Sequence, residues 1–218
     1  MKTCDHLQPL SEQIAHHLLE IGAISITSGE PFVWSSGMMA PVYCDNRLTL
    51  SYPELRDILI DGFLEKVPDY EFDYVAGVAT AGIAHAAMVA QRMSLPLIYV
   101  RPEPKGHGQG NQIEGYLPVG SKVLMIEDLV ATGLSSIQAG EAVKRVTGTM
   151  PVCCLAIFTY NLLGVNDLFA TKGSPLVTLS NFDALLRVAI KTKYIDSSQR
   201  DSLLEWRNDY QSWTVQHQ

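Results

Sequence analysis

The chain has few cysteines, and their spacing fits neither a disulfide framework nor a cysteine-based metal site. The four cysteines among 218 residues are Cys4, Cys44, Cys153 and Cys154. Two of them are adjacent within an apolar run and the other two are isolated, so none has the paired spacing of zinc ligands or of a small disulfide-stapled domain. A protein with this cysteine pattern is expected in the reducing cytoplasm.

Positive charge is also scarce. The chain has 16 lysines and arginines against 23 aspartates and glutamates, which gives a formal net charge of −7. Nucleic-acid surfaces show basic clusters, and this sequence has none. We therefore expect small molecules, and not nucleic acids, as its substrates.

Long hydrophobic runs, internal repeats and low-complexity tracts are missing as well. No apolar stretch approaches the length of a membrane span, and Asp5 and His6 do not fit the start of an export signal. Yet 47% of the residues are hydrophobic, which is enough for one substantial core. We expect a single domain over residues 1–218 that is not associated with a membrane.

From Ser51 onward, segments of helical periodicity alternate with short apolar runs typical of buried strands. This alternation predicts an α/β fold with a mostly parallel central sheet flanked by helices on both faces. The ligand-binding core is expected at approximately residues 70–160. Strands are predicted at 74–79, 97–101, 122–128, 152–159 and 176–179, and helices at 53–67, 83–93, 135–147, 182–191 and 198–210.

The N-terminal part has a different character. Apolar residues first recur at helical spacing, with Ser11 as the expected N-cap and Gly22 as the expected stop. Residues 24–45 are rich in aromatic and β-branched side chains and are interrupted by glycine and proline, which predicts short antiparallel strands. Approximately residues 22–50, with the N- and C-terminal helices, are expected to form a small hood over the core.

The most informative stretch is the apolar run Val123–Ile126 together with the polar residues that follow it. Glu127 and Asp128 come directly after this run, and a loop of small residues from Ala131 to Ser135 follows them. Ligands of parallel sheets bind at the carboxyl ends of the strands. Hydroxyl groups, a glycine that lets backbone N–H groups converge, and a following helix N-terminus make this loop suitable for a phosphate.

The two carboxylates would repel a phosphate, so we expect them to serve another part of the ligand. Carboxylates accept hydrogen bonds from hydroxyl groups, and a ribose offers two ring hydroxyls. We therefore interpret residues 123–136 as a sugar-phosphate site, in which Glu127 and Asp128 hold the ribose and the loop holds its 5′-phosphate. The alternative interpretation is an ordinary buried strand and turn.

Two further loops are predicted at the same edge of the sheet. The loop of residues 102–115 is long, polar and glycine-rich, which is typical of a functional lid. Its Lys105 and His107, with Arg101 just before it, could stabilise a leaving pyrophosphate by charge and hydrogen bonding. The second loop, residues 80–82, places small residues at a helix start, where backbone amides could approach an anion. Simple tight packing is the alternative for this second loop.

These motifs resemble those of a known family. Residues 123–136 are similar to the phosphoribosyl pyrophosphate (PRPP) motif of type I phosphoribosyltransferases. The loop 101–108 looks like the catalytic loop of the orotate phosphoribosyltransferase family, and residues 35–47 are similar to the segment with which that family covers orotate. The likeness extends from about Ile14 to Trp206–Arg207, in a length that suits the monofunctional bacterial type.

The resemblance implies the type I phosphoribosyltransferase fold and a reaction of de novo UMP synthesis. In that reaction, orotate and PRPP give orotidine 5′-phosphate and pyrophosphate. The resemblance also implies Mg²⁺ that is held mainly by PRPP, without an assigned metal ligand in the protein. It further implies a homodimer in which the catalytic loop reaches the neighbouring site.

Carried over residue by residue, the resemblance assigns four sets of site residues. The catalytic residues are Lys105, His107 and Asp128. The orotate contacts are Tyr43, Cys44 and Ala131, and the pyrophosphate contacts are Thr80, Ala81 and Gly82. The PRPP contacts are Arg101, Lys105, His107, Glu127, Asp128, Leu129, Val130, Ala131, Thr132, Gly133, Leu134 and Ser135.

The chain departs from the family pattern at several positions. Many members carry lysine at the positions of Ser35, Ala81 and Pro102, and the PRPP motif usually has serine or threonine at the position of Ala131. Backbone amides can replace much of the missing hydroxyl contact, with a loss of about 1 kcal/mol. Some members bind the orotate carboxylate with an arginine at the position of Tyr160.

Two other functions are alternatives at this level. A phosphoribosyltransferase for another nucleobase would share Glu127 and Asp128 but would differ in the hood. A regulator that senses PRPP without catalysis would lack the catalytic loop and would carry a nucleic-acid surface. The presence of Lys105 and His107, and the acidic net charge, argue against the regulator.

Overall fold

The computed structural model describes residues 8–34, 36–102 and 112–217. Within these ranges, six strands form the central sheet in the order β10-β9-β8-β5-β6-β7. All neighbouring strands pair in parallel except β7 (Ile113–Glu114), which runs antiparallel to β6. The mostly parallel sheet predicted from the sequence is therefore confirmed. Its parallel strands are β5 (Tyr74–Val78), β6 (Leu97–Val100), β8 (Val123–Val130), β9 (Cys153–Thr159) and β10 (Leu176–Asn181).

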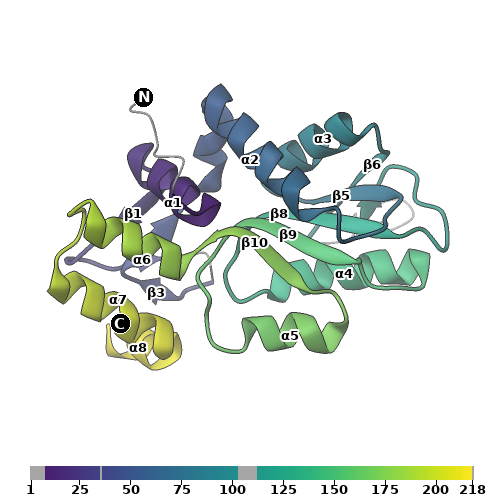
Figure 1. Ribbon diagram of the computed structural model, residues 1–218. Coiled ribbons are helices and arrows are strands. Elements are labelled where there is room, and N and C mark those ends of the chain that lie inside the picture. Colours follow the sequence, from purple (N-terminus) through teal and green to yellow (C-terminus); the bar gives the residue numbers. More distant parts are fainter. Residues whose placement is uncertain (1–7, 35, 103–111, 218) are drawn as a thin grey trace.

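Helices cover both faces of this sheet. Figure 1 shows α2 (Pro53–Lys66) and α3 (Gly82–Met93) above the sheet, and α4 (Leu134–Thr147) and α5 (Val165–Lys172) below it. Because the central strands are buried on both faces, they are almost continuously apolar. All seven residues of β9 are buried, including Cys153 and Cys154, which are free thiols within the core.

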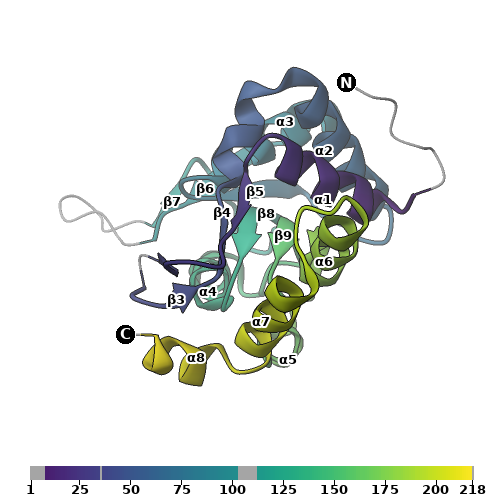
Figure 2. The same cartoon turned by 90° about the vertical axis from the view of Figure 1, so that its left-hand side faces the viewer.

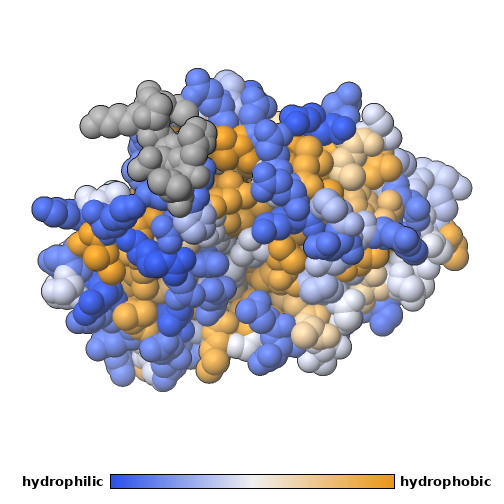
Figure 3. Space-filling model, in the orientation of Figure 1, coloured by the Kyte–Doolittle hydropathy of each residue, from blue (hydrophilic) through white to orange (hydrophobic). Residues whose placement is uncertain are grey.

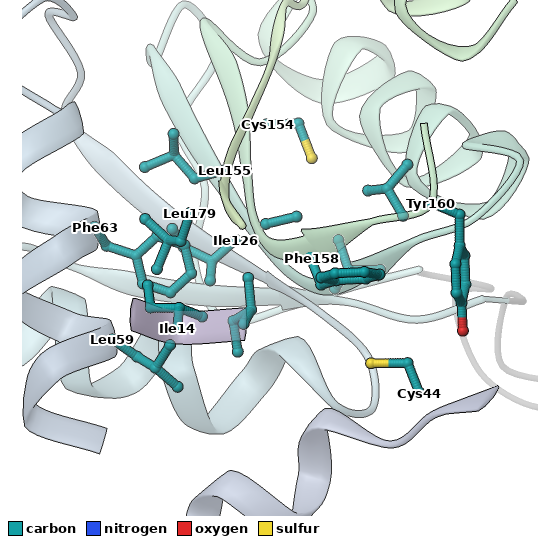
Figure 4. Close-up of a cluster of buried hydrophobic side chains, with 14 of the residues drawn as sticks. Ile14, Cys44, Leu59, Phe63, Ile126, Cys154, Leu155, Phe158, Tyr160 and Leu179 are labelled. Atoms are coloured by element: carbon teal, nitrogen blue, oxygen red, sulfur yellow. The ribbon is translucent and has the colours of Figure 1, made fainter. Parts of the chain in front are cut away.

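Part of the core lies between the sheet and the first two helices. Figure 4 shows Ile14 of α1 (Leu10–Glu20) close to Leu59 and Phe63 of α2 and to Leu179 of β10. All four side chains are at most 2% exposed. On the outside, Figure 3 shows hydrophilic residues spread over this face of the molecule, with apolar residues in patches between them.

The hood consists of two small antiparallel sheets, as the sequence predicted. β1 (Ile24–Ile26) pairs with β4 (Val42–Cys44), and β2 (Phe32–Val33) pairs with β3 (Met39–Ala40). A 3₁₀ helix, η1 (Asn46–Ser51), leads from β4 to α2. The chain returns to the hood at its other end through α6 (Phe182–Lys191), α7 (Ser197–Asn208) and α8 (Tyr210–Gln216). Figure 2 shows α8 close to β3.

Several boundaries differ from those expected. Helix α1 begins at Leu10 with Pro9 at its N-cap, so Ser11 lies inside the first turn and the predicted Ser11 cap is wrong. Strand β8 continues through Glu127 and Asp128 to Val130, because its pairing with β9 extends to Val130 and Thr159. The helix predicted at 198–210 ends at Asn208, since Asp209 is not helical and instead caps the following helix, α8, by accepting a hydrogen bond from the Ser212 amide.

Four elements of the described residues were not predicted: η1, α5, α8 and β7, which lies within the loop expected at residues 102–115. Each is short, and the tertiary contacts that stabilise such elements are not visible in a local sequence pattern. Among the helices in the described ranges, none is long and apolar enough to cross a membrane.

Candidate active site

The predicted substrate loops follow two neighbouring strands, β5 and β8. From this pair the strand order runs in opposite directions, with β6 beyond β5 and with β9 and β10 beyond β8. Such a switch in strand order opens a crevice at the carboxyl ends of the strands, where ligands of open α/β sheets bind. The loop of residues 79–82 follows β5, and the loop of residues 131–133 connects β8 to α4.

Gly82 packs the first of these loops directly against strand β8. A Cβ atom at this position would lie 2.6 Å from the carbonyl oxygen of Ile126 and 3.3 Å from the Cα of Glu127. Both of these atoms belong to the backbone, which cannot move aside as a side chain can. Only glycine therefore allows the start of α3 to pack against β8 at this point. The tight packing that the sequence offered as an alternative is therefore present at Gly82.

The predicted phosphate loop ends at the N-terminus of α4. Gly133 is the N-cap, with a φ of +79°, and a Cβ there would lie 2.8 Å from a ring carbon of Phe169. No side chain in the described ranges caps this helix, so its first-turn N–H groups have no capping acceptor. Together with the exposed Ser135 and the half-buried Thr132, these N–H groups can bind a phosphate.

The two carboxylates at the end of β8 differ in their surroundings. Glu127 is only 6% exposed; its carboxylate accepts hydrogen bonds from the Asp128 amide at 3.0 Å and from the Ser136 hydroxyl at 3.3 Å. Burial and the neighbouring Asp128 raise the pKa of Glu127 well above its usual value. Burial also raises the pKa of Asp128, while hydrogen bonds, among them one from the Leu129 backbone, act in the opposite direction. Asp128 is the more accessible of the two and the better placed for a ligand.

A cavity of about 1030 Å³ opens beside the end of β8. We call one side the sheet wall; it consists of Leu129, Ala131, Thr132, Leu134 and Ser135. Tyr160, which follows β9, also lines the cavity. We call the other side the hood wall; it consists of Val33, Trp34, Ser36, Gly37, Met38, Tyr43, Cys44, Arg47, Tyr210, Gln211 and Thr214.

Stacked aromatic rings join the hood to the sheet. Trp34 stacks on Tyr160 with ring centroids 4.8 Å apart, and Trp206 of α7 packs edge-on against both rings. Tyr160 is 1% exposed, and burial raises its pKa well above the usual value. Figure 4 shows Tyr160 near Cys44 at the end of the buried cluster. Tyr160 thus belongs to the wall of the cavity as a buried ring that anchors Trp34.

Helix α8 completes the hood wall, and sequence reasoning did not find it. The Thr214 hydroxyl lies 3.3 Å from both the backbone nitrogen and the carbonyl oxygen of Met39 in β3. The indole N–H of Trp206 donates to the same carbonyl oxygen at 3.2 Å. The local sequence carries no signal for these contacts, because α8 is far from β3 along the chain.

The structure brings seven of the predicted site residues together around the cavity: Tyr43, Cys44, Leu129, Ala131, Thr132, Leu134 and Ser135. The Val130 side chain is 1% exposed, so only its backbone can reach a ligand. Gly82 packs against Ile126 and Glu127 of β8, and the cavity lining includes none of Thr80, Ala81, Gly82, Glu127, Asp128 and Gly133. Arg101 follows β6 and lies 3.5 Å from the Glu114 carboxylate. Lys105, His107 and Ser35 lie outside the described residues.

Comparisons with known proteins agree with this geometry. The model of the phosphoribosyl transferase domain family matches residues 51–159, which include both substrate loops. The orotate phosphoribosyltransferase of Cutibacterium acnes is 46% identical over 210 residues, covering 95% of this chain and 97% of that protein. The orotate phosphoribosyltransferase of Listeria monocytogenes is 45% identical over 206 residues, covering 94% of this chain and 98% of that protein.

A solved structure supports the same assignment. The crystal structure of orotate phosphoribosyltransferase from Aeropyrum pernix matches with a TM-score of 0.71 at 33% identity, covering 84% of this chain and 99% of that chain. The matched regions of all three relatives extend well beyond residues 51–159 of the domain model. With nearly full-length likeness in sequence and the same fold around the same crevice, the chain belongs to the orotate phosphoribosyltransferase family.

Proposed function

We propose that this protein transfers the 5-phosphoribosyl group of PRPP to orotate, which yields orotidine 5′-phosphate and pyrophosphate in pyrimidine synthesis. The observation that carries this proposal is the switch-point crevice between β5 and β8, in a chain about 45% identical to curated orotate phosphoribosyltransferases. The crevice offers separate places for a phosphate, a ribose and a planar base.

The 5′-phosphate of PRPP binds at the start of α4. Backbone N–H groups after Gly133, the hydroxyls of Thr132 and Ser135, and the positive end of the helix dipole supply its contacts. Ala131 contributes its backbone and leaves space in the cavity. Leu129 and Leu134 add apolar contacts in the sheet wall.

Asp128 and Glu127 hold the ribose hydroxyls and stabilise the reacting sugar. When the base nitrogen displaces pyrophosphate, positive charge develops on the ribose, and an adjacent carboxylate stabilises that charge more in the transition state than in the ground state. Burial raises the pKa of both carboxyl groups, so the protein environment itself disfavours their negative charge. Positive charge that develops on the ribose offsets the cost of keeping these buried carboxyl groups ionised. The transition state is therefore stabilised more than the ground state, and this difference accelerates the reaction.

Orotate lies in the part of the cavity next to Tyr43, Cys44 and Ala131. The ring of Trp34, which is fixed by stacking on the buried Tyr160, gives this region apolar surface that suits a planar pyrimidine. Burial raises the pKa of the Cys44 thiol well above its usual value, so Cys44 serves as a packing residue and not as a nucleophile.

The leaving pyrophosphate is bound by the backbone of Thr80, Ala81 and Gly82 at the start of α3, and by Arg101. Lys105 and His107 assist its departure as cation and proton donor, with the loop that carries them reaching the neighbouring subunit of a homodimer. Free cysteines in the core suit a cytoplasmic enzyme.

Mg²⁺ accompanies PRPP in this proposal. No group of three metal-ligating side chains occurs within residues 8–34, 36–102 and 112–217. In sites of this kind Mg²⁺ is held mainly by substrate phosphates, with one or two carboxylates from the protein. The ion would neutralise charge on the pyrophosphate, and Asp128 is the carboxylate placed to support it.

The experiment that tests the proposed function follows the loss of orotate absorbance after addition of PRPP and Mg²⁺ to the purified protein. Uracil and hypoxanthine are run in parallel as competing bases. A rate with orotate alone supports the proposal and shows that Ala131 is tolerated. A rate with another base would instead assign a different nucleobase, and PRPP binding without any rate would favour the regulator.

A further inference from the structure

Both substrates of the proposed reaction are anions, yet the cavity has little positive charge. Among the described residues that line it, Arg47 is the only charged side chain. The side chain is 62% exposed, so its donor groups are open to the cavity and to solvent. Arg47 is the last residue of the segment 35–47, which resembles the family's orotate-covering segment, but the sequence pattern gave it no role and it has no part in the mechanism described above.

Asp45 holds the Arg47 side chain in a defined orientation. The Asp45 carboxylate accepts hydrogen bonds from the Arg47 Nε at 2.6 Å, from its Nη2 at 2.8 Å and from its backbone N–H at 3.1 Å. A guanidinium has five N–H donors, and this pairing uses one edge of the group. The other edge keeps three N–H donors for a second oxyanion.

The helix that carries Arg47 is itself fixed against the sheet. Asn46 is fully buried; its side-chain amide donates to the carbonyl oxygen of Asp128 at 2.6 Å and accepts from the Cys44 thiol at 3.3 Å. Arg47 follows Asn46 directly, so the contacts of Asn46 with Asp128 and Cys44 fix the backbone that carries Arg47 between the end of the ribose strand and the base side of the cavity. The orotate carboxylate lies on the ring carbon next to the nitrogen that attacks the ribose, so it must come to rest near this junction.

We propose that Arg47 binds the carboxylate of orotate through the guanidinium edge that Asp45 leaves free, and so determines the preference for orotate over uracil. Orotate and uracil share a ring and differ only in this carboxylate. The planar fork of an arginine matches a carboxylate with two parallel hydrogen bonds, and a site built to pair an anion rejects an analogue that leaves the donors unpaired. The pyrophosphate of PRPP has the backbone of residues 80–82 as its own site. This inference rests on the proposed function.

The test compares Arg47→Gln and Arg47→Lys with a matched control, Arg92→Gln. Arg92 is an arginine of similar exposure (50%) that pairs with Asp61 at 2.7 Å, and it does not line the cavity. Steady-state assays give kcat and the KM values for orotate and for PRPP. Quenching of tryptophan fluorescence by orotate measures binding directly, since Trp34 lines the cavity.

In Arg47→Gln we expect the KM for orotate to rise about 10- to 100-fold, which is the usual effect of losing a charged hydrogen bond. The KM for PRPP should stay within about twofold, and the preference for orotate over uracil should fall in parallel. Arg47→Lys should recover only part of the affinity, because an ammonium lacks the fork. Arg92→Gln should behave as the wild type.

Other outcomes would overturn the inference. A rise in the KM for PRPP alone would assign Arg47 to pyrophosphate, and wild-type kinetics in Arg47→Gln would make it an ordinary surface ion pair. These results are distinguishable from failure of the proposed function, in which the wild-type protein itself would not act on orotate.

Discussion

The sheet wall of the cavity comes from consecutive residues, 129–135, whereas the hood wall joins residues as distant along the chain as Val33 and Thr214. The sheet wall is fixed by backbone geometry, through the register of β8 against β9 and the close contact at Gly82. The hood wall is held by single hydrogen bonds and by aromatic stacking. One wall is therefore rigid by construction, and the other depends on a few side chains.

This difference in construction suggests a division of labour. The sheet wall belongs to the part of the chain matched by the general phosphoribosyl transferase domain model, which ends at residue 159. All residues of the hood wall lie outside that match. We infer that the rigid wall serves the ribose phosphate, which all such enzymes share, and that the hood wall selects the base.

The largest effect is expected from breaking the sheet wall at Gly82. In Gly82→Ala the new methyl group would meet the Ile126 carbonyl oxygen at 2.6 Å, and neither backbone can yield cheaply. We expect a loss of about 3 kcal/mol in the free energy of unfolding, measured by urea denaturation, together with loss of activity. Gly29→Ala is the control, because its nearest obstacle is the Thr27 hydroxyl at 3.7 Å. Equal stability of the two variants would contradict the close contact.

The next effect concerns the chemistry of Asp128, which directly precedes the sheet wall in β8. Asp128→Asn keeps the shape of the side chain and removes its charge, so transition-state stabilisation should be lost while the fold is retained. We expect kcat/KM for PRPP to fall about 100- to 1000-fold, with little change in the KM for orotate. Glu141→Gln, which alters an exposed ion pair with Lys172, is the control. Unchanged kinetics in Asp128→Asn would remove Asp128 from the ribose site.

His85 lies behind the sheet wall, one turn into α3, and makes stability depend on pH. Its ring is fully buried, neither ring nitrogen has a hydrogen-bond partner in the described structure, and burial lowers the pKa of His85 from 6.5 to about 4. Between these two values the unfolded chain binds a proton that the folded chain does not, so stability is complete above about pH 6.5 and decreases as the pH falls toward 4.

We expect this single group to reduce the free energy of unfolding by up to about 3 kcal/mol over that range. His85→Leu should remove this part of the pH dependence. Denaturation of both proteins at pH 4, 5, 6 and 8 measures the difference, and the pH 8 values separate titration from packing. Parallel stability profiles of the wild type and His85→Leu would show that His85 is protonated without penalty in the folded protein.

The sequence predicted the sheet wall better than the hood wall, for a physical reason. The strand, the carboxylates and the loop around Gly133 act through local geometry, so they form a contiguous pattern, and the fold and family inferred from it are confirmed. Even there, β8 proved longer than expected, because its end is set by pairing with β9. In the hood wall, Arg47 and Thr214 acquire their positions through Asp45 and Met39, and only tertiary structure brings the second pair together.

The smallest effect is expected from loosening the hood wall at Thr214. Thr214→Val preserves the side-chain shape and removes the hydroxyl that contacts the Met39 backbone. The loss in the free energy of unfolding should be about 1 kcal/mol or less. Because Tyr210 and Gln211 line the cavity from the same helix, the KM for orotate should rise a few-fold while the KM for PRPP is unchanged.

Thr192→Val is the control for Thr214→Val. The Thr192 hydroxyl donates to the helix carbonyl of Val188 at 2.9 Å, and Thr192 does not line the cavity. A similar loss of stability in both variants, with a change in the KM for orotate only in Thr214→Val, would separate base selection by the hood wall from general stability. An equal rise in both KM values would mean that the two walls act as one.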